Sequence, residues 1–267
     1  LMIDTHCHLT SRQLAPRQQE VIDRAELAGV KYMITVATDA QDAIAAADLA
    51  KSDPRVFCSS GIHPLYADSK WKWDLVLEAA KSPRCVAWGE LGLDRHYDEP
   101  PFSMQQKLLE EHLRLIEAQK GDERPIIVHC RRAVDDLLPV FMASDLSPER
   151  FVFHCFTEGP DDARNIIDFG AMISFTGVVT FQNASQVAEA ARLVPLDRLM
   201  VETDAPYLTP EPVRNTRPNE PKYVVHTAAF LAKLRGIDED EFERVLDTNA
   251  INFFNLQMMI TTSSFEV

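Results

Sequence analysis

Two histidines flank a cysteine near the start of the chain, in the segment DTHCHL at residues 4–9. Alternate side chains of an extended strand share a face, so His6 and His8 would point together while Cys7 points away. Two imidazoles on one face can bind a metal ion. An H-x-H pair alone also fits two unrelated surface histidines, so the rest of the chain must decide between these interpretations.

Further histidines and carboxylates stand at the ends of apolar runs along the chain. They are His63, Glu90, His129, His154, Glu202 and Asp204. A cluster of such groups without partners is costly, because buried polar groups lose hydration and like charges repel. Divalent cations remove both costs, and imidazole nitrogen with carboxylate oxygen suits zinc, manganese and similar ions. We therefore expect two divalent ions (Zn²⁺, Mg²⁺ or Mn²⁺), with a third possible.

The order of these residues predicts how they divide between the ions. Glu90, on a central strand, is the expected bridge between two ions roughly 3.5–4 Å apart. One ion would be held by His6, His8 and Asp204, and the other by His129 and His154. Asp204 is also the candidate to accept the proton of an attacking water, so we assign Glu90 and Asp204 to catalysis.

Eight short runs rich in apolar and β-branched residues are the expected strands. They are MIDTHCHL, YMITVAT, VFCSSGIHP, CVAWGELGLD, PIIVHC, FVFHCF, AMISFTGVV and LMVETDAPYL. Segments with helical periodicity alternate with them, at 19–28, 40–50, 73–80, 105–119, 134–142, 160–169, 186–193 and 224–234. This alternation predicts an α/β fold, a single-domain (β/α)8 TIM barrel over residues 1–256, followed by a C-terminal tail at 257–267. Active sites of such barrels lie at the carboxyl ends of the strands, where the polar residues fall.

Composition narrows the class of protein. The chain has 267 residues, 46% hydrophobic and 25% charged, with a formal net charge of −14. That charge argues against a broad basic surface on duplex DNA, but a few phosphates can be bound by metal ions and one or two arginines. Charged residues interrupt every apolar run before the roughly 18 residues that a membrane span needs. No signal peptide is visible and the five cysteines are an odd number, so we expect a cytoplasmic protein with reduced thiols.

The motifs DTHCHL, GIHP, GELGLD, VHC, HCF, ETDAPYL and RNTRPNEP, in this order, resemble the TatD family of metal-dependent deoxyribonucleases, within the amidohydrolase-like superfamily. The resemblance runs from residue 4 to about residue 256. It implies a TIM barrel that uses two or three divalent ions to hydrolyse DNA, often from an end, so the expected partner is DNA or an oligonucleotide end. It also implies a set of metal ligands, His6, His8, Glu90, His129, His154 and Asp204, and a substrate-side role for His63.

The sequence departs from the usual family pattern at residues expected near the substrate. Arg132 stands where the family often has an acid, and Arg95-His96 follows GLD where an aromatic is common. Pro218 separates Arg217 from the Asn-Glu pair in the proline-rich loop after the eighth strand. These changes affect the expected size and identity of the substrate rather than the metal ligands.

Other residues have two interpretations each. Arg131, at the end of the fifth strand, is a candidate phosphate clamp because guanidinium offers a planar fork for two oxygens, or else it pairs with a carboxylate. His63 is either a substrate contact or a satisfied rim histidine. Glu202 would orient a ligand histidine or reach a third ion. His112 is expected on a solvated helix face, and Trp71 and Trp73 in packing.

Two alternative functions remain. An amidohydrolase could open amide or cyclic amide bonds with the same barrel and metals, but many such enzymes bridge their ions with a modified lysine on strand four. The fourth run contains no lysine, and Glu90 occupies the equivalent place, which favours the nuclease. A barrel that only binds nucleic acid or a protein would be expected to have lost ligands, and none is missing. The sequence indicates no particular protein partner.

Overall fold

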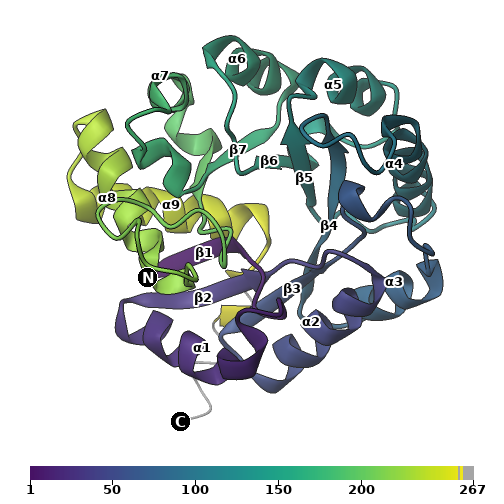
Figure 1. Ribbon diagram of the computed structural model, residues 1–267, viewed down its shortest axis with the longest axis horizontal. Helices are drawn as coiled ribbons and strands as arrows, with labels where there is room; N and C mark the ends of the chain where they lie inside the picture. The colour runs from purple at the N-terminus through teal and green to yellow at the C-terminus, as the bar shows by residue number, and fades with distance from the viewer. Residues whose placement is uncertain (258, 261–267) are drawn as a thin grey trace.

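The computed structural model describes residues 1–257, 259 and 260. Eight parallel strands form one sheet in the order β1 to β8, surrounded by helices (Figure 1). The strands are β1 Met2–Cys7, β2 Val30–Thr35, β3 Val56–Ser60, β4 Cys85–Asp94, β5 Ile126–Arg131, β6 Phe151–His154, β7 Met172–Phe175 and β8 Leu199–Val201. The predicted (β/α)8 TIM barrel is therefore confirmed.

The first and last strands meet just beyond β8. Cys7 forms a parallel bridge with Ala205. The His8 amide donates to the Ala205 carbonyl at 2.7 Å, and the Asp204 amide donates to the His6 carbonyl at 2.9 Å. These bonds bring the segment that carries both N-terminal histidines beside the segment that carries Asp204.

Helices follow the strands in the predicted alternation. They are α1 Gln18–Leu27, α2 Ala40–Ser52, α3 Trp73–Ala80, α4 Phe102–Glu117, α5 Val134–Met142, α6 Pro160–Phe169, α7 Ser185–Leu193 and α8 Val224–Arg235. Short 3-10 helices lie at Ala15–Arg17, Pro64–Tyr66, Pro148–Arg150, Gly177–Thr180, Leu196–Arg198 and Pro221–Tyr223. Within the described part of the chain, no helix is long and apolar enough to cross a bilayer.

A further helix, α9 (Glu239–Phe253), was not predicted from the sequence. The Asp238 side chain caps it by accepting from the Glu241 amide at 3.1 Å. Its C-terminal part and the residue Leu256 pack against the apolar bottom layer of the barrel. Of the expected tail, Met259 and Ile260 pack against the same cluster, while Met258 and residues 261–267 lie outside the described residues.

Strand alternation separates an apolar layer from a polar layer inside the barrel. The bottom layer includes Ile127, Val152, Met172 and Met200 from β5 to β8. Two residues farther along each of these chain segments lie His129, His154, Ser174 and Glu202. The intervening residues, such as Cys130, join the outer core between sheet and helices. In β5 to β8, the polar side chains that face inward thus lie at the carboxyl ends.

Candidate active site

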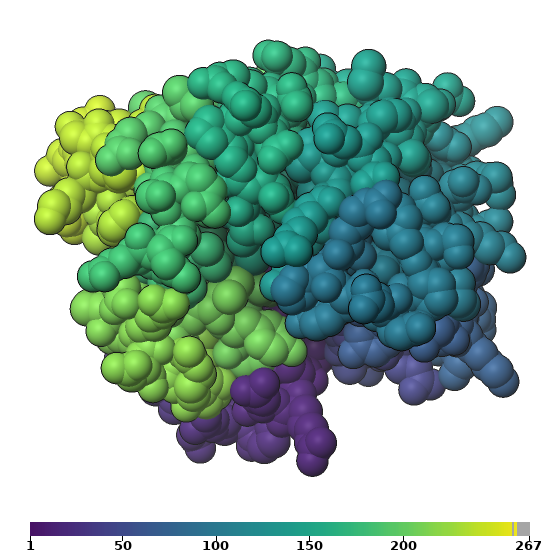
Figure 2. Space-filling view, turned by 45° about the horizontal axis from the view of Figure 1, so that its top comes forward, coloured from purple at the N-terminus to yellow at the C-terminus, as the bar shows by residue number. Residues whose placement is uncertain are grey.

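Glu90 lies at the centre of the polar layer, with its side chain 2% exposed. Its Oε1 atom lies 3.7 Å from His6 Nε2 and 3.6 Å from His8 Nε2. Asp204 Oδ1 approaches the same two nitrogens at 3.7 and 3.2 Å. The imidazoles of His6, in β1, and of His8, just after it, therefore lie between a carboxylate of β4 and the carboxylate that follows β8. In the space-filling view, N-terminal residues in purple meet segments in blue and light green (Figure 2).

The other oxygen of Glu90 faces a second group of histidines. Oε2 lies 2.9 Å from His154 Nε2 and 3.5 Å from His129 Nδ1. His63 Nε2 lies 3.7 Å from the same oxygen. One carboxylate thus presents its two oxygens to histidines of different strands, which is the arrangement that a ligand bridging two cations needs.

The cluster leaves buried polar atoms without hydrogen bonds. Among the described residues, Glu90 Oε2 and His6 Nδ1 have no hydrogen-bond partner. The 2.9 Å contact between Glu90 Oε2 and His154 has the distance of an ion pair but not the angle of a hydrogen bond. Three overlapping sets place their ligand atoms within 4.8 Å of one another: His6, His8 and Glu90; His6, His154 and Glu202; His63, Glu90 and His129. Nitrogen and carboxylate donors in this number fit borderline divalent cations.

Opposite charges control the ionisation of the cluster. Burial alone would raise the pKa of Glu90, but the surrounding histidines, foremost His63 and His154, hold it well below its usual value. Burial favours the neutral ring of His8, yet the neighbouring Asp204 and Glu90 carboxylates raise its pKa to about 9. Glu90 is therefore ionised at neutral pH, as a metal ligand must be.

Asp94 orients His129, and the sequence analysis did not single it out. His129 Nε2 donates to Asp94 Oδ2 at 2.9 Å, which leaves a lone pair on Nδ1. That Nδ1 atom lies 3.1 Å from His63 Nε2 and 3.5 Å from Glu90 Oε2. Gln105 accepts from the Asp94 amide at 2.8 Å and fixes this end of β4. Position 94 lies four residues after Glu90 in the same strand, so strand parity was the signal that could have identified it.

Glu202 holds His154 in the same way. The Nδ1 atom of His154 lies 3.2 Å from Glu202 Oε1, and the Cys155 amide donates to that oxygen at 2.6 Å. The His154 ring stacks on His6 with centroids 3.9 Å apart. Glu202 therefore directs the other ring nitrogen of His154 towards Glu90, which fits the orienting role expected from the sequence.

His63 has its protonation state set by the backbone. The amide of Leu65 donates to His63 Nδ1 at 3.0 Å, so the neutral ring carries its proton on Nε2. Burial, together with the charges of His129 and His154, lowers the pKa of His63 to about 3 although Glu90 opposes the shift. A protonated Nε2 has no lone pair for a metal, so His63 faces the site as a hydrogen-bond donor.

The loop after β8 is tied to the barrel by its Asn-Glu pair. The side-chain Nδ2 of Asn219 donates to the carbonyls of Thr203 and Tyr207 at 3.1 and 2.5 Å, on either side of Asp204. Glu220 accepts two hydrogen bonds from Arg24 of α1, at 2.9 and 3.0 Å. The Pro218 insertion therefore leaves the support of Asp204 in place.

The structure also locates Arg131 and His112. Arg131 ends β5 on the face of His129, and its guanidinium lies 5.5 Å from the Tyr97 ring. The prediction that His112 lies on a solvated helix face is wrong: His112 is fully buried, and neither ring nitrogen has a hydrogen-bond partner among the described residues. Its ring packs edge-on against Trp73 at 4.8 Å, because this face of α4 turns towards α3 rather than towards solvent.

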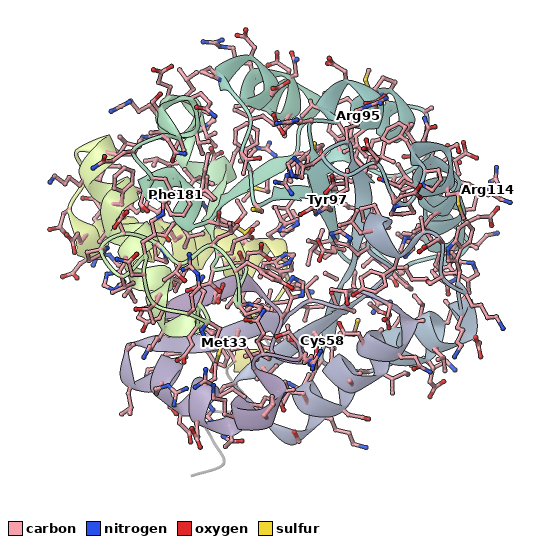
Figure 3. The ribbon with its side chains drawn as sticks, in the orientation of Figure 1. Met33, Cys58, Arg95, Tyr97, Arg114 and Phe181 are labelled. Atoms are coloured by element: carbon pink, nitrogen blue, oxygen red, sulfur yellow. The ribbon has the colours of Figure 1, made fainter. Side chains whose placement is uncertain are left out.

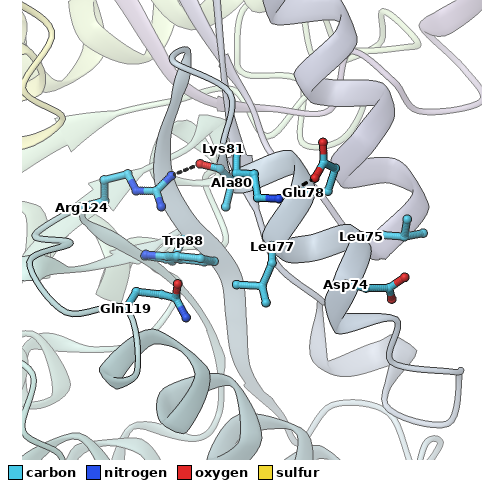
Figure 4. Close-up of a pocket in the computed structure, with 9 residues that line it drawn as sticks. All are labelled: Asp74, Leu75, Leu77, Glu78, Ala80, Lys81, Trp88, Gln119 and Arg124. Atoms are coloured by element: carbon cyan, nitrogen blue, oxygen red, sulfur yellow. Dashed lines mark hydrogen bonds and ion pairs between the residues drawn. The ribbon is translucent and has the colours of Figure 1, made fainter.

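A separate hollow of about 580 Å³ lies between α3 and the start of β4, at the amino ends of the strands (Figure 4). Arg124 lies over the Trp88 ring at 4.6 Å and donates to the Ala80 carbonyl at 2.8 Å. In the lining of this hollow Lys81 pairs with Glu78, and none of the clustered histidines lines it. The polar layer at the carboxyl ends is therefore the candidate active site.

A family model described as TatD related DNase matches residues 3–255. The chain belongs to the TatD family. The uncharacterized metal-dependent hydrolase YcfH of Escherichia coli strain K12 is 35% identical over 260 residues, which cover 96% of each chain. The uncharacterized metal-dependent hydrolase YabD of Bacillus subtilis strain 168 is 32% identical and is covered completely, with 96% of this chain aligned. These matches confirm the resemblance seen in the motifs.

Solved structures agree with this assignment. The TatD homologue YjjV of Escherichia coli K12 superposes with a TM-score of 0.87 at 31% identity, covering 95% of this chain and 98% of the other. A phosphotriesterase homology protein of Escherichia coli, complexed with phosphate, has a TM-score of 0.65 at 17% identity, covering 95% of this chain and 98% of that one, and shows only a shared fold. The chain is thus a metal-dependent hydrolase of the TatD family.

Proposed function

We propose that this TatD-family hydrolase cleaves phosphodiester bonds of DNA, removing nucleotides from an end, with two divalent ions. The observation that carries the proposal is that the two carboxylate oxygens of Glu90 face different histidines. Oε1 faces His6 and His8, and Oε2 faces His129 and His154. In this proposal His6, His8 and Asp204 would hold one ion, His129 and His154 would hold the other, and Glu90 would serve both. A bound divalent ion supplies Lewis acidity towards a phosphoryl oxygen and lowers the pKa of water.

Asp204 is the proposed proton acceptor. Its side chain is 13% exposed, against 2% for Glu90, so water can reach it. Burial raises its pKa, but the hydrogen bond and charge of His8 bring the pKa below the usual value. An ionised carboxylate at the mouth of the site can take the proton of a water that attacks phosphorus.

His63 and Arg131 are proposed to act on the substrate. His63 presents its Nε2–H to the site, so it can donate a hydrogen bond to a phosphoryl or leaving oxygen. Arg131 ends the strand of His129 and offers a guanidinium fork to a phosphate. All five cysteines are free thiols, which supports a location in a reducing compartment such as the cytoplasm.

The test is a hydrolysis assay on oligonucleotides labelled at the 5′ or the 3′ end. Purified protein with Mn²⁺, Mg²⁺ or Zn²⁺ should shorten one of them stepwise, and chelation with EDTA should stop the reaction. The label that is released first marks the end from which the enzyme works, and the opposite label stays on the shortened products. Inert DNA together with hydrolysis of cyclic amides would overturn the proposal in favour of an amidohydrolase.

A further inference from the structure

Exposed aromatic rings gather around the mouth of the candidate site. Tyr66, Tyr97 and Tyr207 are 41%, 51% and 52% exposed. The other large apolar side chains of the described chain that are exposed are aliphatic: Leu1, Leu27, Met104, Met142 and Leu193. The Tyr66 ring lies 6.4 Å from that of His63, and the Tyr207 ring lies 6.3 Å from that of His8. Open rings are thus concentrated beside the catalytic cluster.

Arg131 is unusual among the partly buried arginines of the described chain. Eight others bond a carboxylate or a backbone carbonyl: Arg24, Arg55, Arg84, Arg124, Arg150, Arg198, Arg214 and Arg235. The Arg131 guanidinium has no hydrogen bond or ion pair within the part of the chain that the structure describes, and its neighbour is the Tyr97 ring at 5.5 Å. A partly desolvated guanidinium whose donors form no hydrogen bond or ion pair favours an anionic ligand.

Neighbouring groups hold this pair in place. Arg131 pairs with Asp94 in the β4–β5 register and lies two residues after His129, so both side chains face the barrel mouth. Arg95 donates to both oxygens of Asp136 at 2.7 and 2.6 Å and lies over the Phe102 ring at 3.7 Å. In Figure 3, Tyr97 lies nearer the middle of the barrel than Arg95 does. Arg95 therefore anchors the loop, while Tyr97 and Arg131 remain open to a ligand.

We propose that Tyr97 and Arg131 form a nucleotide subsite beside the scissile bond, in which Tyr97 stacks on a base and Arg131 binds that nucleotide's phosphate. An exposed aromatic ring can stack on a base, and the free guanidinium donors beside it can bind the phosphate next to that base. Every base has an aromatic face, so the subsite accepts any base. The inference rests on the proposed function, since it assigns a position on the DNA substrate.

The test measures binding as well as cleavage. A fluorescent oligonucleotide whose terminal linkages are phosphorothioates, which resist hydrolysis, is titrated with protein in Mg²⁺ and followed by anisotropy. Tyr97→Ala should weaken binding roughly 5- to 100-fold, since one stacked base contributes about 1–3 kcal/mol. Tyr97→Phe, which keeps the ring, should bind as the wild type does.

An abasic oligonucleotide completes a thermodynamic cycle. With a base removed from one of the last two positions, the wild type should bind as weakly as Tyr97→Ala, and the substitution should cause no further loss. Arg131→Gln should weaken binding of both oligonucleotides, whereas Arg244→Gln, at an exposed position on α9, should change neither.

The outcomes separate the two proposals. Equal affinity of the wild type and Tyr97→Ala for the intact oligonucleotide would overturn the subsite even if DNA is cleaved, as would the absence of any binding by the wild type. Binding that depends on Tyr97 in a protein that cleaves no DNA would support the subsite and overturn the proposed nuclease activity.

Discussion

At the scale of single residues, the site depends on how carboxylates fix the histidines around them. The sequence predicted which six side chains would meet, because residue type and strand parity place them on one face at the ends of strands. Strand parity could also have placed Asp94 on this face, as it did Glu202. It could not say that Asp94 bonds His129, because that contact depends on the β4–β5 register, which aligns Asp94 with Arg131.

Asp94→Asn should weaken divalent-ion binding by about 10- to 100-fold, because an amide holds the His129 proton less strongly than a carboxylate does. Isothermal titration of the protein with Mn²⁺ or Zn²⁺ measures this affinity directly. Asp136→Asn is the matched control, since Asp136 pairs with Arg95 away from the histidines. Unchanged affinity in Asp94→Asn would show that His129 needs no such support.

His112 should make the free energy of unfolding fall in acid. Burial lowers its pKa from 6.5 to about 3, so between these values the unfolded chain binds a proton that the folded chain does not. As far as His112 is concerned, the free energy of unfolding therefore has its full value above pH 6.5. It decreases towards pH 3, by at most about 1.4 kcal/mol per pH unit. His112→Leu removes this titration. Urea denaturation should show the variant gaining stability over the wild type between pH 7 and pH 4.5, and a constant difference would contradict the account.

At the scale of elements, local patterns predicted the strands and the first eight helices. The helix α9 was missed because its packing partners are distant in the sequence. Its end and Leu256 cover the bottom of a barrel formed by strands from the whole chain. The capping residue Asp238, three positions before Glu241, was the local signal available. Close approach between strands was equally invisible in the sequence.

Gly92 shows how tightly β4 and β5 approach each other. A Cβ atom at this position would lie 1.9 Å from the His129 carbonyl oxygen, at a φ of +149°. Gly92→Ala should therefore cost roughly 3 kcal/mol or more of stability and displace His129. Gly121→Ala is the control, because φ is +82° there but no atom lies within 4 Å, and it should cost only about 1–2 kcal/mol. Equal denaturation midpoints for the two variants would refute the steric argument.

At the scale of the whole molecule, the closed sheet brings distant segments to one mouth. β1 contributes the first histidines, and Asp204 reaches them only because the chain returns after β8 and pairs with it. The repeated strand and helix pattern was sufficient to predict this closure. The net charge of −14 and the carboxylates of the cluster would repel a phosphate, so the proposed DNA substrate would need bound cations at this mouth.

The most direct measurement is the metal content of the purified protein after loading with Mn²⁺ or Zn²⁺ and removal of free ions, determined by elemental analysis. The account predicts two ions per wild-type chain. In Glu90→Gln, which has nearly the same shape but no charge, it predicts the loss of at least one ion with an unchanged circular dichroism spectrum. A wild type without stoichiometric metal, or a Glu90→Gln variant that keeps both ions, would contradict it.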